Sequence, residues 1–352
     1  MSSAPTPASS PPGGLSAFTQ QLLVAVLGLI SLVIVIYLLR EFSDMLKPLC
    51  VAAFLAYLVI PAHLWLVSKG INRPLAALAL IMIVVGVFTG LGMLLYANTE
   101  TLLLKWPTYE AKWKQITTDF LGSLPQSFRE NLTMQLTDTN IVGSELRGFL
   151  GSFLSFFTSF AVVVIYLAFL LAERSSLPHR LQNAFGEARA GEISDILASI
   201  SQAITQYVAV KAFISLLGAL GTTIILLLFG VDFALTWGTL AFLLNFIPYL
   251  GSALATVLPV LLAMVQLDSV WVPLLIFALL IGMQQFLGLA VEPRMQGAKL
   301  GVSPLLIILS LAFWGVVWGI IGMLLAVPLL MVVKIILQNI PATKPVALLM
   351  GK

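Results

Sequence analysis

The sequence predicts an all-α polytopic integral membrane protein, with about eight transmembrane or re-entrant helical segments and two hairpins of broken helices. Of its 352 residues, 60% are hydrophobic and only 9% are charged, and its mean hydropathy is +1.05. Soluble domains carry about 25% charged residues, so this composition cannot cover a soluble surface. The apolar residues occur in solid runs instead of alternating segments, which excludes a transmembrane β-barrel.

The chain begins with a polar, uncharged stretch. Residues 1–20 are rich in Pro, Ser and Gly and contain no charged side chain. This composition predicts a disordered N-terminal tail. No basic region precedes the first apolar run and no small-residue cleavage site follows it, so we expect that run to be a retained helix.

Six apolar runs are long enough to cross a hydrocarbon core of about 30 Å, which needs about 20 residues of helix. These runs are residues 22–39, 48–67, 75–97, 149–172, 212–229 and 270–291. They predict transmembrane helices 1–3 within residues 21–97 and a fourth helix at 149–172. A transmembrane core with two hairpins is expected at 212–337, followed by a cytoplasmic tail at 338–352.

Two polar stretches separate these runs. Residues 98–148 mix acids and bases and predict an extramembrane, periplasmic helical region. Residues 173–211 predict a cytoplasmic amphipathic helical region. Its apolar face consists of Ile193, Ile196, Leu197, Ile200, Ile204, Tyr207 and Val208. We expect this face to lie on the membrane surface or against a neighbouring subunit of a homo-oligomer.

The remaining apolar segments predict the two hairpins. Residues 233–247 and 253–267 are short for a crossing, and the uncharged turn PYLGS at 248–252 joins them. We expect a helical hairpin whose tip lies at membrane depth. Residues 304–336 would form a helix about 50 Å long, so this segment should fold back at WGIIG, residues 318–322. Paired segments interrupted by Gly and Pro point to a transporter's binding site.

The distribution of basic residues predicts the orientation of the chain. With the N-terminus in the cytoplasm, the cytoplasmic segments hold 11 of the 18 basic residues and the outer segments hold seven. Basic residues favour the cytoplasmic side, so both termini are expected there. The result is the same whether the first hairpin spans the membrane twice or re-enters it.

One carboxylate stands next to a long apolar helix. Ionisable residues in such positions are costly and often functional. Glu292 directly follows the apolar run, Pro293 is expected to end the helix, and Arg294 lies two positions on. Glu292 has two interpretations: a carboxylate that exchanges a proton or binds a cation, or a structural partner of Arg294 or another basic group.

Three neutral polar side chains interrupt otherwise apolar helices: Asn245, Gln284 and Gln285. Such groups either hydrogen-bond a polar solute or bond a neighbouring helix. The residues predicted to line a substrate or ion pathway are Asn245, Pro248, Tyr249, Gly251, Gln284, Gln285, Glu292 and Arg294.

Other function classes lack the residues that their chemistry needs. The chain contains no GxxxxGK[ST] run, no GxGxxG after a strand and no HExxH motif. Its single cysteine and two isolated histidines do not form a metal-ligand pattern, and no catalytic pair is visible in the spans. We therefore expect no enzyme activity, no cofactor, no metal and no nucleic-acid partner. The expected partners are a small polar solute or ion and the lipid bilayer.

Several motifs in order along the chain resemble the autoinducer-2 exporter family of bacterial membrane proteins. They are NFIPYLG at 245–251, EPRMQG at 292–297, LGVSPLLIILSL at 300–311 and WGVVWGIIGMLLAVPL at 314–329. Earlier pieces, including LKPLCVAAFLAYLVIP at 46–61, fit as well. The resemblance covers nearly the whole chain. It departs at PYLG, where the branch that exports the quorum-sensing signal tends to carry PNIG.

The resemblance implies a multi-spanning transporter of the bacterial inner membrane. One branch of the family is associated with export of autoinducer-2, and another with sodium/proton exchange. We therefore expect a secondary transporter that exports a small polar solute, with autoinducer-2 as a candidate. The alternatives are a sodium/proton antiporter and a membrane scaffold that transports nothing. A scaffold does not account for two apolar hairpins with Gly–Pro tips.

Overall fold

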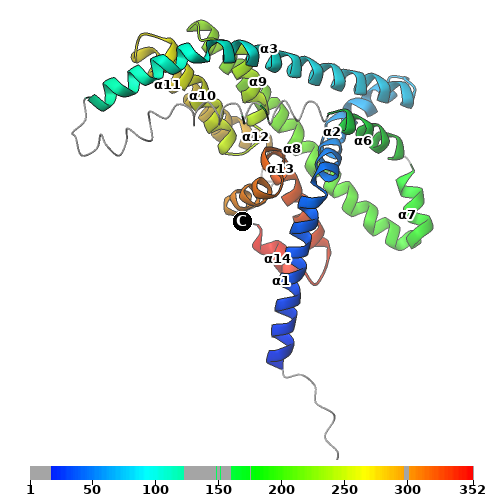
Figure 1. Cartoon of the computed structure of the whole chain (residues 1–352). Helices are drawn as coiled ribbons and strands as arrows, with labels where there is room; N and C mark the ends of the chain where they lie inside the picture. The colour runs from blue at the N-terminus through cyan, green and yellow to red at the C-terminus, as the bar shows by residue number, and fades with distance from the viewer. Residues whose placement is uncertain are drawn as a thin grey trace, which may run out of the picture. The chain divides into compact units, whose positions relative to one another are not determined.

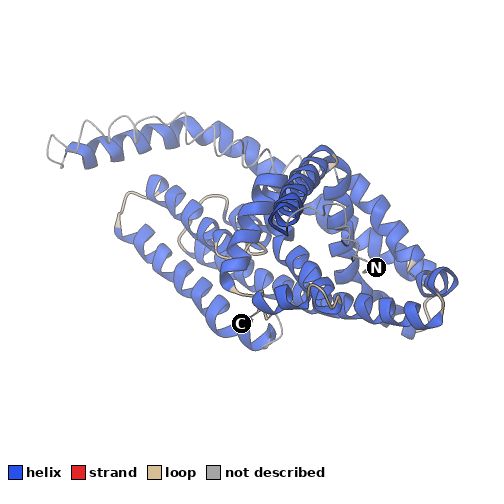
Figure 2. Ribbon diagram, turned by 90° about the horizontal axis from the view of Figure 1, so that it is seen from below, coloured by secondary structure: helices blue, strands red, loops and turns tan. Residues whose placement is uncertain are grey.

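The computed structural model describes residues 17–122, 148, 151, 160–174, 176–296 and 301–351. In this part of the chain every regular element is a helix, and none is a strand (Figure 2). The chain divides into two compact units, Met1–Leu46 and Lys47–Lys352, and the site described below lies entirely in the second. Of the predicted N-terminal tail, residues 1–16 lie outside the described residues, whereas Ala17 already begins a helix.

The helices are, in chain order, α1 (Ala17–Glu41), α2 (Ser43–Ser68), α3 (Arg73–Gly122), α6 (Phe160–Glu173), α7 (Leu177–Phe185), α8 (Glu187–Leu228), α9 (Ala234–Leu244), α10 (Leu250–Gln266), α11 (Trp271–Phe286), the π-helix η1 (Leu287–Val291), α12 (Glu292–Gln296), α13 (Pro304–Asn339) and α14 (Lys344–Leu349) (Figure 1).

Among the described residues, five helical stretches are long and apolar enough to cross a membrane. These are Ser43–Ser68, Arg73–Asn98, Glu187–Leu228, Trp271–Met295 and Pro304–Asn339. The pair α6 and α7, bent by 65°, makes a sixth if it is one broken span. The chain is therefore a helical multi-pass membrane protein, as predicted. The predicted number of about eight segments is not confirmed.

Two helices run further than predicted. The third predicted span continues without a break into the predicted extramembrane region as α3, and residues 123–147 lie outside the described residues. The predicted amphipathic region, residues 173–211, is divided: its first part contains the separate helix α7, and its part from Glu187 on forms one helix, α8, with the next span, because no proline interrupts residues 187–228. On its apolar face, Ile200, Ile204 and Val208 are buried within the chain itself. These residues therefore do not lie on the membrane surface or against another subunit.

Helices α9 and α10 form the first predicted hairpin. They contain 11 and 17 residues, so at 1.5 Å per residue α9 is about 16 Å long and α10 is about 26 Å long. The tip between them holds Tyr249 at φ 63° and ψ −59°, a positive φ that is uncommon for a residue with a side chain. Gly251 begins the second arm, where a Cβ atom would overlap the backbone carbonyl of Leu244. The lack of a side chain at Gly251 lets the two arms meet.

Helix α13 forms the second predicted hairpin. Gly319 has non-helical dihedral angles of φ 68° and ψ −144°, which break the helix inside the predicted fold-back WGIIG. The hydroxyl of Ser310 in the first arm donates a hydrogen bond of 2.9 Å to the carbonyl of Ala326 in the second. A Cβ atom on Gly322 would overlap the carbonyl of Trp314. Both hairpins thus close over a glycine that faces a backbone carbonyl.

The hydrophobic core of the second unit is centred on the first hairpin. Helix α9 packs along α8, α10 packs against α9 and α11, and α3 contacts both arms of the hairpin. Leu226, Leu240, Leu244 and Leu280 are among the fully buried side chains of this core. The hairpin is therefore enclosed by longer helices, and its apolar arms do not need to face water.

Helix α3 holds the base of the first hairpin through polar contacts. Lys105 forms an ion pair of 2.6 Å with Asp232, and the hydroxyl of Tyr109 donates a hydrogen bond of 2.7 Å to the same carboxylate. Asp232 lies in the turn between α8 and α9. Gln266, at the end of α10, accepts a hydrogen bond from the Asp232 amide and donates one to Gly230. We call Lys105, Tyr109, Asp232 and Gln266 the base clamp.

The base clamp sets a pH dependence of stability. Partial burial would raise the pKa of Asp232, but hydrogen bonds from Lys105 and Tyr109 and the charge of Lys105 hold that pKa below its ordinary value. A depressed carboxylate pKa stabilises the fold above the unfolded pKa of about 4, and this contribution is lost as the pH falls through the folded pKa. Asp232→Asn should therefore lower the melting temperature at neutral pH and flatten its decline in acid.

The control for this prediction is Asp268, which pairs with Lys112 at 3.0 Å but has a side chain that is 94% exposed. Exposed ion pairs contribute little to stability, so Asp268→Asn should leave the pH profile close to that of the parent. Thermal unfolding in detergent between neutral and acidic pH measures both variants. Identical profiles for Asp232→Asn and the parent would show that the base clamp does not contribute to stability.

Candidate functional site

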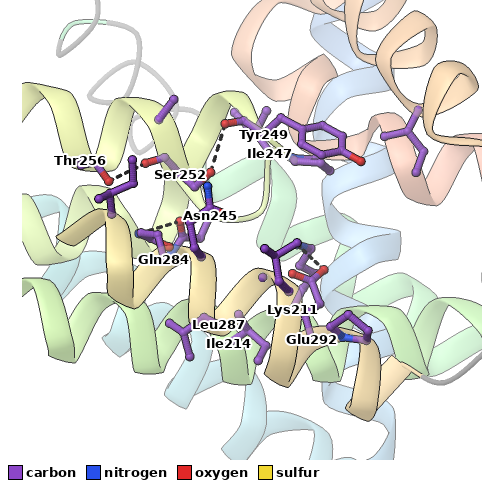
Figure 3. Close-up of a pocket in the computed structure, with 18 of the residues that line it drawn as sticks. Lys211, Ile214, Asn245, Ile247, Tyr249, Ser252, Thr256, Gln284, Leu287 and Glu292 are labelled. Atoms are coloured by element: carbon purple, nitrogen blue, oxygen red, sulfur yellow. Dashed lines mark hydrogen bonds and ion pairs between the residues drawn. The ribbon is translucent and has the colours of Figure 1, made fainter. Parts of the chain in front are cut away.

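A cavity of about 690 Å³ lies in the second unit, where the tip of the first hairpin meets α8 and the stretch from α11 to α12 (Figure 3). The residues predicted from the sequence that line it are Asn245, Pro248, Tyr249, Gln284, Gln285 and Glu292. The hairpin tip and the stretch from α11 to α12, two separate parts of the chain, therefore bring predicted polar side chains to one cavity.

The other two predicted residues do not line the cavity. Gly251 is buried at the start of α10, where its role is the close approach to Leu244 described above. Arg294 is exposed on α12. The structure therefore assigns Gly251 to the construction of the hairpin tip and leaves Arg294 outside the cavity.

The charged centre of the cavity is an ion pair between α8 and α12. The ammonium of Lys211 lies 2.5 Å from a carboxylate oxygen of Glu292, and the two side chains are 8% and 20% exposed. This pair replaces the predicted pairing of Glu292 with Arg294, because Lys211 reaches the cavity from α8 while Arg294 does not line it. The more general expectation of a basic partner for Glu292 holds. Lys211 itself was not predicted as a site residue.

A wide helical turn precedes Glu292. The predicted helix end at Pro293 is wrong, because the helix continues through Pro293 to Gln296. Proline cannot donate the backbone hydrogen bond to the residue four positions earlier, and its ring clashes with that carbonyl in an α-helix. The π-helical turn Leu287–Val291 comes directly before, and such turns are frequent at functional sites.

Amides from two helices meet on another wall of the cavity. The side-chain nitrogen of Gln284 on α11 donates a hydrogen bond of 3.4 Å to Asn245 Oδ1 at the end of α9. Asn245 is 8% exposed, and its Nδ2 atom has no hydrogen-bond partner among the described residues. Gly218 on α8 makes room for this amide, because a Cβ atom there would lie 2.5 Å from Nδ2.

Tyr207 is a second cavity residue that was not predicted as part of the site. It lies one turn before Lys211 on α8, is 3% exposed, and its hydroxyl has no hydrogen-bond partner in the part of the chain that the structure describes. In the sequence it counted only as one apolar position of the amphipathic face. The hydroxyl of a buried tyrosine usually finds a hydrogen-bond partner. A tyrosine on an otherwise apolar face was therefore the signal in the sequence that could have identified Tyr207 as a site residue.

The hydroxyls of Ser252 and Thr256, close to the hairpin tip, are satisfied by the backbone. Ser252 donates to the carbonyl of Tyr249 at 3.1 Å, and Thr256 donates to the carbonyl of Ser252 at 2.9 Å (Figure 3). They shape the cavity wall. The cavity residues whose polar atoms could contact a solute are Tyr207, Lys211, Asn245, Tyr249, Gln284, Gln285 and Glu292. Within the described residues, no group of three or more His, Cys, Asp or Glu side chains could hold a metal ion.

A polar cavity bounded by a broken-helix hairpin, inside a helical multi-pass protein, is the arrangement of a membrane transport protein. The chain belongs to the family described as AI-2E family transporter, whose family model matches residues 26–342. The predicted family is confirmed.

Two relatives cover nearly the whole chain. The AI-2 transport protein TqsA of Escherichia coli strain K12 is 30% identical over 338 residues, which are 94% of this chain and 95% of TqsA. The protein named "Putative transport protein YhhT" of the same strain is 28% identical over 331 residues, with 92% and 93% coverage. The chain is therefore a membrane transport protein by family.

Proposed function

We propose that this protein is a secondary transporter that carries a small polar solute out across the bacterial inner membrane through the cavity beside the first hairpin. The observation that carries the proposal is the convergence of the Lys211–Glu292 pair and the Asn245 amide on one cavity within a helical membrane protein. These groups supply both hydrogen-bond donors and acceptors, and the charges of the ion pair cancel. A site of this kind favours an uncharged solute rich in oxygen, because a net charge would have no compensating partner.

Autoinducer-2 is the first solute to test. The support comes from TqsA, which is named an AI-2 transport protein and is 30% identical to this chain. The cavity differs from the signal-exporting branch at Tyr249, which stands at the hairpin tip where that branch tends to carry an amide. We therefore propose small polar solutes as the class and autoinducer-2 as one candidate within it.

Uptake into everted membrane vesicles tests this proposal. Vesicles containing the protein should accumulate the transported solute faster than vesicles from cells without it. The same solute should protect single cysteines at Tyr249 and Ser252 from thiol reagents, in a Cys50→Ala background. Uptake at the background rate for autoinducer-2 and for other small polar solutes, with no protection at the tip, would contradict the proposal.

A sodium/proton antiporter is the second candidate, and one observation favours it. Glu292 is a carboxylate held largely away from water beside an amine, and such a pair can exchange protons during a transport cycle. If Glu292 carries the coupling proton, Glu292→Gln vesicles should lose pH-dependent sodium transport at matched protein level. An unchanged rate and pH profile would exclude this role.

We propose that both termini lie in the cytoplasm, which follows from the basic-residue count. In the predicted periplasmic region Thr117 is buried, whereas Thr118, one position on, is exposed and suits a labelling probe. In a Cys50→Ala background, Thr118→Cys should react with an impermeant reagent from outside intact cells, and the exposed Ala188→Cys only after the inner membrane is opened. The reverse pattern would overturn the orientation.

A further inference from the structure

Unsatisfied polar atoms are concentrated on one pair of helices. Within the described residues, six buried side-chain polar atoms have no hydrogen-bond partner in the chain. They belong to Tyr207, Ser215 and Thr222 on α8, and to Thr236, Trp237 and Asn245 on α9 and its C-terminal cap. No other pair of elements in the described part packs as extensively as α8 and α9. The unpaired atoms thus lie on the two helices that share the largest contact.

The lack of a hydrogen-bond partner is a property of particular positions, because neighbouring hydroxyls on the same helices do have partners. Hydroxyls inside helices commonly donate to the carbonyl four residues earlier. Thr223 does so to Ala219 at 2.9 Å, and Thr239 does so to Leu235 at 2.9 Å. Thr222, next to Thr223, makes no such bond, although it is fully buried. Buried polar groups without partners are few in native structures, and each calls for an explanation.

Buried polar groups on α8 form a line that begins in the cavity. Tyr207, Lys211, Ser215 and Thr222 follow at intervals of four, four and seven residues, so they share one face of the helix. Tyr207 and Lys211 line the cavity, whereas Ser215 and Thr222 lie further along the helix toward the base clamp. All four are buried.

Helix α9 lies antiparallel to α8 along this line. Near the cavity, Gly218 of α8 faces the Asn245 amide, and toward the base clamp Thr223 of α8 faces Gly238 of α9. This register places Thr236 and Trp237 on the clamp side of Gly238. Ser215 and Thr222 lie three and four residues from Gly218, on the same face of α8, so that face packs on α9. We call this contact between α8 and α9 the seam, and its polar side chains are those of Ser215 and Thr222.

We propose that the seam opens during transport and that its polar side chains then line the route of the solute and its water between the cavity and the base clamp. The inference rests on the proposed transport function. In the closed seam these side chains are buried without partners, and in the open seam water or the solute's oxygen atoms satisfy them. A conformation that buries unpaired polar groups is readily exchanged for one that hydrates them.

The backbone beside the seam provides a hinge. The turn between α8 and α9 contains Gly230 at φ 67° and Phe233 at φ 59°, both in the left-handed region. A few residues at an element's end commonly absorb the dihedral changes of a hinge motion. The base clamp holds Asp232 within this turn, so the hairpin swings about the clamped end and the seam parts first at the cavity.

A reversible cross-link across the seam tests the inference. A Cβ atom on Gly238 would lie 3.2 Å from Thr223 Cβ, slightly below the Cβ separation of about 3.5–4.5 Å in disulfides, and 2.9 Å from the carbonyl oxygen of Ala219, so α8 and α9 must separate slightly to admit the cross-link. The variant is Thr223→Cys with Gly238→Cys in a Cys50→Ala background. Oxidation should reduce solute uptake by at least about tenfold, and reduction should restore it. Oxidised protein that is shown to be cross-linked and still transports at the reduced rate would overturn the inference.

Thiol labelling provides a readout that depends neither on the cross-link nor on transport. Ser215→Cys and Thr222→Cys should react with a small polar methanethiosulfonate at least about tenfold faster than Leu280→Cys, a fully buried position on α11. Equal, slow reaction at all three positions would overturn the inference even if the parent transports. Rapid labelling of the seam in a protein that moves none of the tested solutes would support the seam while contradicting the proposed function.

Discussion

Replacing Glu292 by glutamine is expected to destabilise the folded protein by about 3–5 kcal/mol, because it leaves the ammonium of Lys211 buried without its counter-ion. The loss should appear as a lower melting temperature in detergent and a lower amount of protein in the membrane. Reversing the pair, with Lys211→Glu and Glu292→Lys together, should restore much of the stability because the opposite charges face each other again.

Arg294→Gln is the matched control for this prediction. Arg294 lies two residues from Glu292 on the same short helix but is exposed. Surface substitutions usually change stability by less than about 0.5 kcal/mol, so this variant should behave like the parent. If Glu292→Gln proves as stable as Arg294→Gln, the ion pair with Lys211 does not hold α8 to α12.

Replacing Gly251 by alanine is expected to prevent the first hairpin from closing. The added Cβ atom would overlap the backbone carbonyl of Leu244, and a backbone group at a helix end cannot move aside as a flexible side chain can. We expect a loss of more than about 3 kcal/mol in the free energy of unfolding, together with loss of transport. Gly322→Ala should have the same effect on the second hairpin, at the carbonyl of Trp314.

Gly282→Ala serves as the control, since Gly282 lies within α11 and a Cβ atom there would meet open space, with no neighbouring atom of the described residues within 4 Å. Alanine inside a helix is more favourable than glycine by about 0.5–1 kcal/mol, so this variant should be at least as stable as the parent. Thermal unfolding and membrane protein levels compare the three variants. Parent-like stability of Gly251→Ala would contradict the close approach of the two arms at the tip.

The two hairpins could be predicted from the sequence because their signals are local. A helix interrupted by Gly and Pro, or one too long for the bilayer, must break, and the structure breaks α13 at Gly319 within the predicted fold-back. Polar residues in apolar segments were visible in the same way. Asn245, Gln284 and Glu292 all reach the cavity that the structure reveals.

Lys211 and Tyr207 could not be assigned to the site from the sequence, because their role depends on which helix faces α8. Lys211 stood at the border between a polar stretch and an apolar run, where a basic residue is ordinarily a topology signal. Its partner Glu292 lies far along the chain, and only tertiary packing brings the two together. The same reason explains why Arg294 was predicted as the partner of Glu292. Arg294 is the basic residue nearest to Glu292 in the sequence, whereas Lys211 is the one that meets Glu292 in space.

The central claim is that solute passes through the cavity beside the first hairpin, and Asn245 tests it most directly. Asn245→Ala removes an amide whose Nδ2 atom has no partner in the described part of the chain and whose Oδ1 atom accepts a long hydrogen bond of 3.4 Å from Gln284, so the fold should lose little. The measurement is initial solute uptake into everted vesicles at matched protein level, for Asn245→Ala and the parent. We predict a reduction of at least about tenfold, equivalent to one lost hydrogen bond to the solute. Uptake equal to that of the parent would contradict the claim.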